Sequence, residues 1–328
     1  MAKRRRSSSF CSNHDRRLSS PIDDEEGYLK VSQNMRINEY ETSSLLGQGT
    51  FGKVFQATNK NTGAKVALKI IKSISKYTDA ALREIKILQR IARHDPENTH
   101  RCIHLTLNFM YKHHVVLEFP FIRGGSLFSY TESTSFAPIP LKNIRSIAKQ
   151  LIDAVAFIHR LEMVHTDLKP GISNKTNPEN IMLEYIPHAR TRSSHKEFSI
   201  ILIDFGSTVQ KDERHSAIVS TRHYRAPEIL LGVSWSFPCD VWSIGCILVE
   251  IFTGPVLFQT HENLEHLRII EIILGRIPAN LIERSLNCST GTADSLFRGY
   301  RVDYPNQETE LQSIEFINSV QPLHVMLV

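Results

Sequence analysis

Residues suited to phosphate chemistry recur along this chain, and the first set is a glycine-rich stretch. Gly47-Gln-Gly49-Thr-Phe-Gly52-Lys-Val54 joins two segments that read as β-strands. Glycines let a backbone turn tightly and approach phosphate groups without side-chain clashes. The stretch leads into a strand rather than a helix, which argues against a dinucleotide-binding fingerprint. Taken alone, it is equally well explained as a glycine-rich hairpin that binds nothing.

The second set is a lysine that closes an apolar strand, Val66-Ala67-Leu68-Lys69, with Glu84 on the helix expected after it. A single strand lysine is usually exposed to solvent, and so is a single helix glutamate. Their order behind the glycine-rich stretch is that of a clamp for the phosphates of ATP. The combination, rather than either residue, carries this inference.

The third set contains two acidic motifs further along the chain. His165-Thr-Asp167-Leu-Lys169-Pro follows an expected helix, and Asp204-Phe-Gly206 follows an apolar strand. Asp167 can accept a hydroxyl proton, and Lys169 can stabilise a transferring phosphoryl group. Asp204 suits a Mg²⁺ ion bound to phosphates. An isolated Asp-Phe-Gly is ordinarily a plain turn, but that explanation is weak behind the upstream motifs.

Hydrophobic periodicity predicts the elements that must position these residues. The pattern predicts strands at 40–46, 54–58, 65–71 and 115–119, and helices at 79–93, 141–161, 240–252 and 264–274. Asp79 is the expected N-cap of the first helix. A β-rich front and an α-rich back predict an α+β fold of two lobes, an N-lobe over 37–120 and a C-lobe over 121–328, with a cleft between them.

Composition excludes several classes of protein. At 328 residues with 41% hydrophobic content the chain is typical of a globular protein. No uncharged apolar run reaches 18 residues, and the basic residues near the start are followed by serines rather than an apolar segment. These features predict neither a membrane span nor a secretory signal. Five scattered cysteines indicate a reducing compartment and no metal motif.

The net charge of +5 belongs to the first twenty residues, where six basic residues face one acidic residue. Residues 1–36 are poor in apolar residues, which predicts a disordered basic Arg/Ser tail. The nearly neutral remainder, without aromatic stacking motifs beside the basic residues, gives little support to an RNA-binding protein, so no direct nucleic-acid binding is expected. We also expect a monomer.

Two further motifs, Ala226-Pro-Glu228 and Asp240-Val-Trp-Ser-Ile-Gly245, complete a recognisable set. With them the chain resembles a eukaryotic protein kinase from about residue 38 to at least 275. Val219-Ser-Thr-Arg-His-Tyr-Arg-Ala-Pro-Glu228 and Glu265-His-Leu-Arg-Ile-Ile-Glu271-Ile-Ile-Leu-Gly275 resemble the LAMMER (CLK-type) kinases, and 258–267 is similar to the plant members. Arg268, Ile269, Ile270 and Ile272 depart from the family signature.

The resemblance implies a role for each candidate residue. Lys69 would bind the α- and β-phosphates and pair with Glu84, Asp167 would be the catalytic base, Lys169 would contact the γ-phosphate, and Asp204 would bind Mg²⁺. The remaining ATP-binding residues would be Gly47, Gly49, Gly52, Val54, Ala67 and, in a hinge over 118–121, Glu118.

The implied function is ATP-dependent phosphorylation of Ser and Thr, and of Tyr by autophosphorylation, in protein substrates. The family phosphorylates Arg/Ser-rich splicing factors. Lys3–Arg6 resembles a nuclear-import patch, and the Arg/Ser segments 4–9 and 16–20 resemble the substrates of such kinases. Nuclear localisation, with a cytoplasmic pool, follows from this resemblance.

The chain departs from the family pattern in three places. Eight residues, 171–178, precede Glu179-Asn180, which makes Asn180 the better candidate for the second Mg²⁺ ligand and Asn174 the weaker one. Thr166 stands where many kinases have Arg, which predicts activity without a phosphorylated activation loop. The match fades after about residue 284, which suggests a truncated C-lobe with Glu228 unpaired. The insertion and this ending leave open a pseudokinase that serves as a scaffold, or a mis-spliced product.

Overall fold

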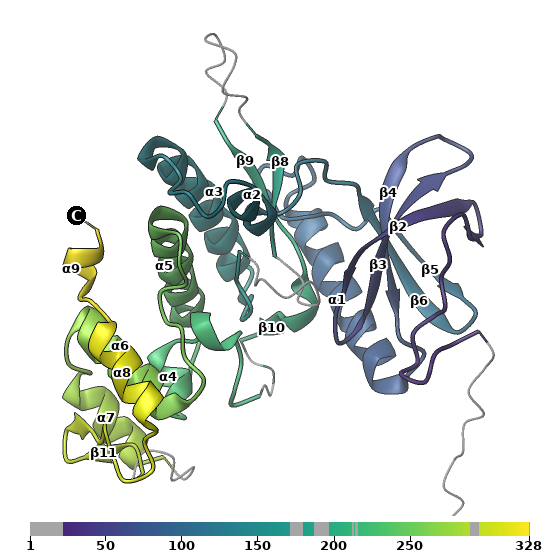
Figure 1. Ribbon diagram of the computed structural model, residues 1–328. Helices are drawn as coiled ribbons and strands as arrows, with labels where there is room; N and C mark the ends of the chain where they lie inside the picture. Colours follow the sequence, from purple (N-terminus) through teal and green to yellow (C-terminus); the bar gives the residue numbers. More distant parts are fainter. Residues whose placement is uncertain are drawn as a thin grey trace, which may run out of the picture.

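The computed structural model describes residues 22–170, 180–186, 197–211, 213, 216–288 and 295–327. Figure 1 shows two lobes, with a twisted antiparallel sheet in one and most of the helices in the other. The sheet order is β1-β2-β3-β4-β6-β5. Its strands are β1 (Arg36–Ile37), β2 (Tyr40–Gln48), β3 (Gly52–Asn59), β4 (Lys65–Ile71), β5 (Leu107–Tyr111) and β6 (His114–Pro120). The expected α+β, two-lobed fold is confirmed.

Strand pairing fixes which residues share a face of this sheet. Lys69 pairs with Leu117 and Ala67 with Phe119, while Leu68 pairs with Glu118. Successive side chains point to opposite faces. One face packs on helix α1 (Ser75–His94) and the main core, and the other buries a separate apolar cluster that includes Leu29, Ile37, Tyr40, Leu68 and Val116. Lys69 therefore lies on the face that meets the helical lobe.

Helix α1 begins four residues before its predicted start. Its N-cap is Ile74, whose carbonyl accepts bonds from the amides of Tyr77 and Thr78, so the prediction that Asp79 caps the helix is wrong. Asp79 is instead exposed on the second turn. The buried stripe includes Ala81, Glu84, Ile85, Leu88 and Ile91, which is the i, i+3, i+4 spacing of an amphipathic helix. A glutamate within that stripe is directed at the sheet.

The C-lobe is built on two long helices, α3 (Leu141–Arg160) and α5 (Pro238–Thr253), which pack against each other. Short strands and 3-10 turns lie between them and the N-lobe: β7 (Met163–Val164), β8 (Ile181–Tyr185), β9 (Ser199–Leu202), η1 (Phe205–Ser207), β10 (Val209–Gln210) and η2 (Arg222–Tyr224). Both acidic motifs lie at the ends of these short elements. The tight turns of this region thus carry the candidate catalytic and metal-binding residues.

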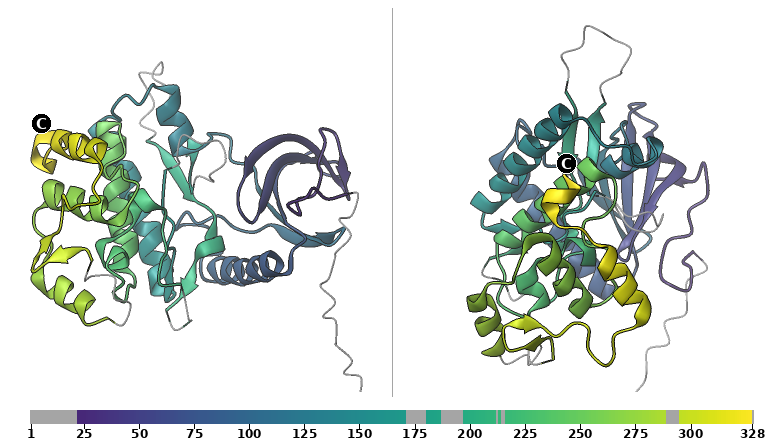
Figure 2. Two further views of the ribbon diagram at one scale, coloured as in Figure 1. Left: turned by 60° about the horizontal axis from the view of Figure 1, so that its bottom comes forward. Right: turned by 60° about the vertical axis from the view of Figure 1, so that its left-hand side comes forward.

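Helix α2 (Leu127–Ser133) lies against β8. The remaining elements form the far end of the C-lobe, and they are α4 (Pro227–Leu230), α6 (Asn263–Leu274), α7 (Ala279–Leu286), β11 (Phe297–Arg298), β12 (Arg301–Val302), α8 (Leu311–Ser319) and α9 (Leu323–Met326). Figure 2 shows α8 and α9 on the side of the molecule opposite the N-lobe sheet. Helix α8 packs on α6, where Ser313 Oγ donates to Glu265 at 2.6 Å. No helix in the described ranges is long and apolar enough to cross a membrane.

Part of the segment predicted to be a disordered tail is folded onto the N-lobe. Residues 1–21, including the Arg/Ser segments, lie outside the described residues. Residues 22–36 are ordered, with Tyr28 and Leu29 buried against the N-lobe, so the boundary at residue 36 is wrong. Because this segment is acidic and mostly polar, its composition concealed the two apolar residues that anchor it.

Candidate active site

Lys69 joins three parts of the structure through its ammonium group. Its Nζ lies 2.7 and 2.9 Å from the two carboxylate oxygens of Glu84 on α1, and 2.9 Å from Oδ1 of Asp204. Burial opposes the charge of Lys69, but Asp204 and Glu84 outweigh it and raise the pKa of the ammonium. The pKa of Asp204 is lowered because the charge of Lys69 outweighs the effect of burial. The N-lobe sheet, α1 and the C-lobe are thereby connected by charge.

Asp204 sits in a strained turn directly after β9. Its φ of 60° and ψ of 77° lie in the left-handed region, which is uncommon for a residue with a side chain. The next residue, Phe205, is fully buried and packs edge-on against the ring of His165. A Cβ on Gly206 would lie 3.2 Å from Asp204 Oδ1 and 3.3 Å from Glu84 Oε2. Glycine at 206 leaves both carboxylates free to meet Lys69.

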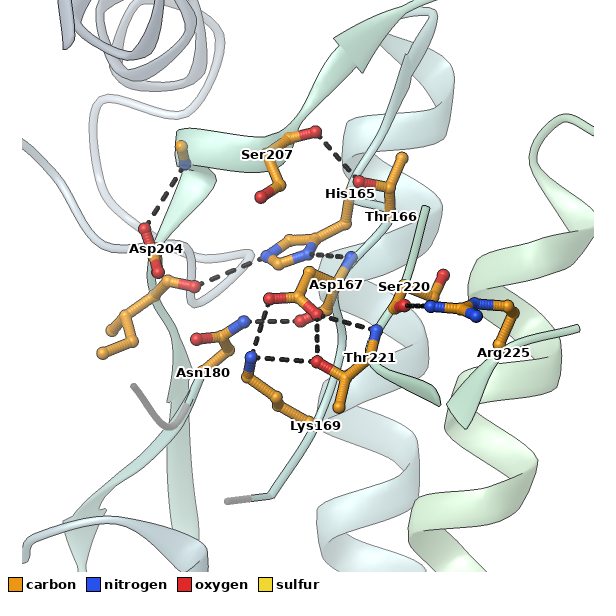
Figure 3. Close-up of polar contacts among 12 residues, drawn as sticks. His165, Thr166, Asp167, Lys169, Asn180, Asp204, Ser207, Ser220, Thr221 and Arg225 are labelled. Carbon is orange, nitrogen blue, oxygen red and sulfur yellow. Dashed lines mark hydrogen bonds and ion pairs between the residues drawn. The ribbon is translucent and has the colours of Figure 1, made fainter. Parts of the chain in front are cut away.

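Asp167 is held by bonds from two side chains and one amide (Figure 3). Its Oδ2 accepts from Lys169 Nζ at 2.8 Å, and its Oδ1 accepts from Thr221 Oγ1 at 2.7 Å and from the Thr221 amide at 3.1 Å. Lys169 Nζ also donates to Thr221 Oγ1 at 3.1 Å. The carboxylate is therefore oriented while about 20% of its side-chain surface stays accessible.

The backbone that carries Asp167 is anchored by a buried carboxylate at the start of α5. The oxygens of Asp240 accept from the amides of His165 and Thr166, each at 2.8 Å, and also meet His159 Nε2 at 2.8 Å. Thr166 has a φ of 69°, and its hydroxyl donates to the Ser207 carbonyl at 2.9 Å. By accepting these two amides, Asp240 stabilises the tight turn that brings Asp167 to the surface of the site.

Asn180 returns to the same loop behind the inserted residues 171–178, which lie outside the described residues. Its amide donates to the Lys169 carbonyl at 3.3 Å, and its side-chain Nδ2 donates to the Asp167 carbonyl. The Asn180 side chain is fully buried, and its Oδ1 has no hydrogen-bond partner among the described residues. The flanks of the insertion are thus joined, and Asn180 lies against the loop that carries Asp167 and Lys169. Asn174 cannot be compared, because it lies outside the described residues.

The glycine-rich stretch forms the hairpin between β2 and β3. Gly47 pairs with Val54, and Val54 pairs with Lys69. Val54 therefore points to the same face as Lys69 and Ala67. A Cβ on Gly52 would lie 2.3 Å from the Ile70 carbonyl oxygen, so only glycine fits there. The amide of Gly49 donates to the Gly52 carbonyl at 2.9 Å and closes the tip.

Glu118 is the expected ATP-binding residue that the structure places elsewhere. Its buried carboxylate accepts the Tyr40 hydroxyl at 2.5 Å on the opposite face of the sheet, and its carbonyl accepts from the Thr106 amide at 2.9 Å. Strand β6 continues to Pro120, so the connection between the lobes begins at Phe121. Successive side chains of a strand point to opposite faces, and the sequence did not define which residues of β6 point to which face. In the structure Glu118 points away from Lys69.

These residues fit a nucleotide with a divalent cation. Asn180 Oδ1 is an oxygen without a partner, Asp204 supplies a second oxygen, and oxygen ligands are what Mg²⁺ prefers. Among the described residues there is no cluster of three or more His, Cys, Asp or Glu side chains that would hold a metal without help. The phosphate oxygens of a bound nucleotide would therefore have to complete the coordination.

Comparisons with known proteins agree with this geometry. The sequence model of the protein kinase domain matches residues 40–297. The chain belongs to the protein kinase family. It is 44% identical over 314 residues to the dual specificity protein kinase lkh1 of Schizosaccharomyces pombe, covering 93% of this chain and 44% of that protein. It is 39% identical to the serine/threonine-protein kinase AFC3 of Arabidopsis thaliana, covering 94% and 78%.

Human dual specificity protein kinase CLK2 is 43% identical, with coverage of 82% of this chain and 54% of that protein. A crystallised kinase domain superposes with a TM-score of 0.80 at 29% identity, covering 92% of this chain and 90% of that one. These relatives place the chain in the LAMMER (CLK-type) branch. These yeast, plant and human relatives are 39% to 44% identical to the chain. The chain spans about half the length of several relatives.

Sequence reasoning left two site residues of this kinase without a role. Thr221 binds Asp167, and Asp240 anchors the turn before it. Both lie in motifs that were recognised, one before Ala226-Pro-Glu228 and one at the head of α5. Glu228 is the residue expected to be unpaired, and burial raises the pKa of its carboxyl; a backbone hydrogen bond and the charge of Arg284 offset this only in part.

Proposed function

We propose that this chain is an active protein kinase that transfers a phosphoryl group from ATP to Ser and Thr side chains, and to Tyr during autophosphorylation. ATP would supply the phosphoryl group, with Mg²⁺ as the divalent cation on its phosphates. The observation that carries the proposal is the ammonium of Lys69 bound at once to Glu84 and Asp204. Phosphoryl transfer by this family requires that the sheet, α1 and the Asp204 turn be correctly placed relative to one another. The ion pairs of Lys69 with Glu84 and Asp204 connect all three.

Each residue of the site then has a chemical task. Lys69, fixed by Glu84, would bind the phosphates, and Asp204 with Asn180 Oδ1 would hold the cation. Asp167 would accept the proton of the substrate hydroxyl as the hydroxyl oxygen bonds to the γ-phosphorus. The bond from that phosphorus to the bridging oxygen breaks, and ADP leaves. Lys169 lies 2.8 Å from Asp167 and would stabilise the charge on the phosphoryl group in transfer.

Arg/Ser-rich proteins, including splicing factors, are the proposed substrates, and the chain is proposed to act as a monomer. Support comes from the LAMMER branch to which the chain belongs and from its own Arg/Ser segments at 4–9 and 16–20. Those segments would be autophosphorylation targets, and Lys3–Arg6 would direct nuclear import. Deletion of residues 1–20 should reduce nuclear accumulation of a fluorescent fusion. Unchanged accumulation would contradict the localisation.

The activity is tested with Mg²⁺-ATP and an Arg/Ser-repeat peptide. We expect the wild-type protein to incorporate phosphate into the peptide. For Asp204→Asn or Asp167→Asn we expect kcat to fall by at least about 100-fold. Glu213→Gln, a change in the same segment away from these contacts, is the matched control and should retain activity. Equal incorporation by wild type and Asp204→Asn, or none by either, would overturn the proposal.

The inserted residues 171–178 favour the second candidate, a pseudokinase scaffold, and the flanks of the insertion argue against it. Because the Asn180 amide already donates to the Lys169 carbonyl, deleting 171–178 would leave a four-residue turn, Lys169-Pro170-Glu179-Asn180, closed by that same bond. Proline suits the second position of such a turn. We expect the deletion variant to retain kcat within about threefold. A gain of tenfold or more would show that the insertion inhibits the enzyme.

A further inference from the structure

Residues 22–30, which we name the N-terminal strap, are fixed to the N-lobe beside the glycine-rich hairpin. Ser73 Oγ donates to Asp23 Oδ2 at 2.7 Å, and His114 Nε2 lies 2.9 Å from Asp23 Oδ1. The Ser73 amide donates to the Gly27 carbonyl at 3.0 Å. Leu29 is buried in the apolar cluster on the outer face of the sheet. The strap is therefore attached to the end of β4 and to β6, both rigid parts of the sheet.

From that base the strap contacts the hairpin in two places. The Tyr28 hydroxyl donates to the Gly49 carbonyl at 2.7 Å, and Tyr28 is only 5% exposed. Asp24 forms an ion pair with Lys53 at 3.3 Å, and the Lys53 ammonium also lies 4.3 Å from the centre of the Tyr28 ring. Lys72 covers the same ring at 4.0 Å. The Tyr28 ring thus lies between the ammonium groups of Lys53 and Lys72, and its hydroxyl contacts the tip of the hairpin.

The bond to Gly49 fixes a segment that would otherwise be loose. Gly49 already donates its amide to Gly52, so the Tyr28 bond occupies its other backbone group. Among the described residues the amides of Thr50 and Phe51 donate to nothing, and they remain available to phosphate oxygens. A glycine-rich loop loses much conformational entropy when a ligand orders it. Holding its tip beforehand reduces that loss and strengthens binding.

We propose that Tyr28 is a positioning residue that pre-organises the glycine-rich hairpin for the phosphates of ATP. This inference rests on the proposed nucleotide site. A purely structural tyrosine would need only its ring, because the ring fills the space between Lys53 and Lys72. The hydroxyl adds a directional bond to Gly49 at the tip of the hairpin, and that bond acts on the loop rather than on the core.

The test compares Tyr28→Phe with Tyr111→Phe, a matched control whose hydroxyl lies 3.4 Å from the Arg36 carbonyl on the same lobe, away from the hairpin. We expect Tyr28→Phe to raise KM for ATP about three- to tenfold with kcat changed less than about twofold. Hydrogen exchange of the amides at 47–52 should quicken in the nucleotide-free variant. The unfolding temperature of Tyr28→Phe should stay at the wild-type value. In Tyr111→Phe, KM for ATP and hydrogen exchange at 47–52 should both stay at wild-type values.

Asp24→Asn supplies a second variant, which loses the charge opposite Lys53 and should show the same pattern more weakly. Unchanged exchange at 47–52 in Tyr28→Phe would overturn the inference whether or not the protein binds ATP. An unchanged KM for ATP in an active Tyr28→Phe enzyme would overturn it as well, and so would an equal rise in Tyr111→Phe. A wild-type protein without ATP affinity would instead overturn the proposed function, and with it any role of Tyr28 toward ATP.

Discussion

Asp167 and Thr221 show how the site is set at the scale of single residues. A carboxylate that must accept a proton has to be oriented without being neutralised, and a hydroxyl can do this by donating one bond. Thr221 donates to Asp167 at 2.7 Å and accepts from Lys169 at 3.1 Å, so one hydroxyl fixes both charged groups. Its amide adds a bond that a change of side chain leaves in place.

Thr221→Ala is therefore expected to reduce kcat by about 10- to 100-fold, because the hydroxyl that orients both groups is lost. The KM for ATP should change little, since no Thr221 atom contacts Lys69 or Asp204. Steady-state kinetics with an Arg/Ser peptide would measure both values. Thr221→Ser keeps the hydroxyl and should retain most of the activity. Equal kcat for the Ala and Ser variants would contradict this role.

At the scale of elements, hydrogen bonds to backbone carbonyls hold the start and the end of the segment between Asp204 and Glu228. Thr166 donates to the Ser207 carbonyl near its start. Near its end, Arg225 donates to the carbonyls of Val219 and Ser220 at 2.9 and 2.8 Å. Figure 3 shows that Arg225 approaches Ser220 from the side opposite Lys169. Because residue 166 is threonine, it offers no arginine to bind a phosphorylated side chain. The segment is held by hydrogen bonds to backbone carbonyls instead.

Phosphatase treatment should consequently leave kcat within about twofold of the untreated enzyme. The physical reason is that no cation at position 166 requires a phosphorylated side chain as its partner. Mass spectrometry would confirm removal of phosphate, and turnover on an Arg/Ser peptide would be measured before and after. A mock incubation without phosphatase is the control. Loss of most of the turnover would show that a phosphorylated side chain is needed after all.

At the scale of the whole molecule, helix α5 connects two distant parts of the C-lobe. Asp240 at its start anchors the turn of Asp167, and Glu250 near its end accepts the Tyr224 hydroxyl at 2.7 Å. Burial raises the pKa of Glu250 from 4.5 to about 7, and the bond from Tyr224 offsets this only in part. The folded protein therefore holds a proton on Glu250 that the unfolded chain releases near pH 4.5.

Between about pH 4.5 and 7 this carboxyl makes the free energy of unfolding fall as pH rises, because the folded state binds the extra proton. Glu250→Gln should remove that slope and stabilise the protein relative to wild type by on the order of 2 kcal/mol more at pH 7.5 than at pH 5. Urea unfolding across this range would measure it. Glu262→Gln, at an exposed position, is the control, and parallel pH curves for Glu250→Gln and wild type would rule the effect out.

Local signals in the sequence went far for this protein. Strand β4 matches its predicted bounds, and α3, α5 and α6 begin or end within about two residues of theirs. Lys69 pairs with Glu84 and Asp204, and Lys169 pairs with Asp167, all residues that the motifs had singled out. The start of α1 was missed because Ile74 caps it through backbone geometry alone. Such a cap leaves no trace in residue type.

The sequence by itself determined the two-lobed fold and the charged residues of the site, because these depend on periodicity and on chemically demanding motifs. Only the tertiary structure decided which face of β6 carries Glu118, since a strand shifted by one residue exchanges its two faces. It also decided that Asn180 rejoins the Asp167 loop and that Tyr28 reaches Gly49. These are contacts between residues distant in the chain, and they exist only once the core has packed.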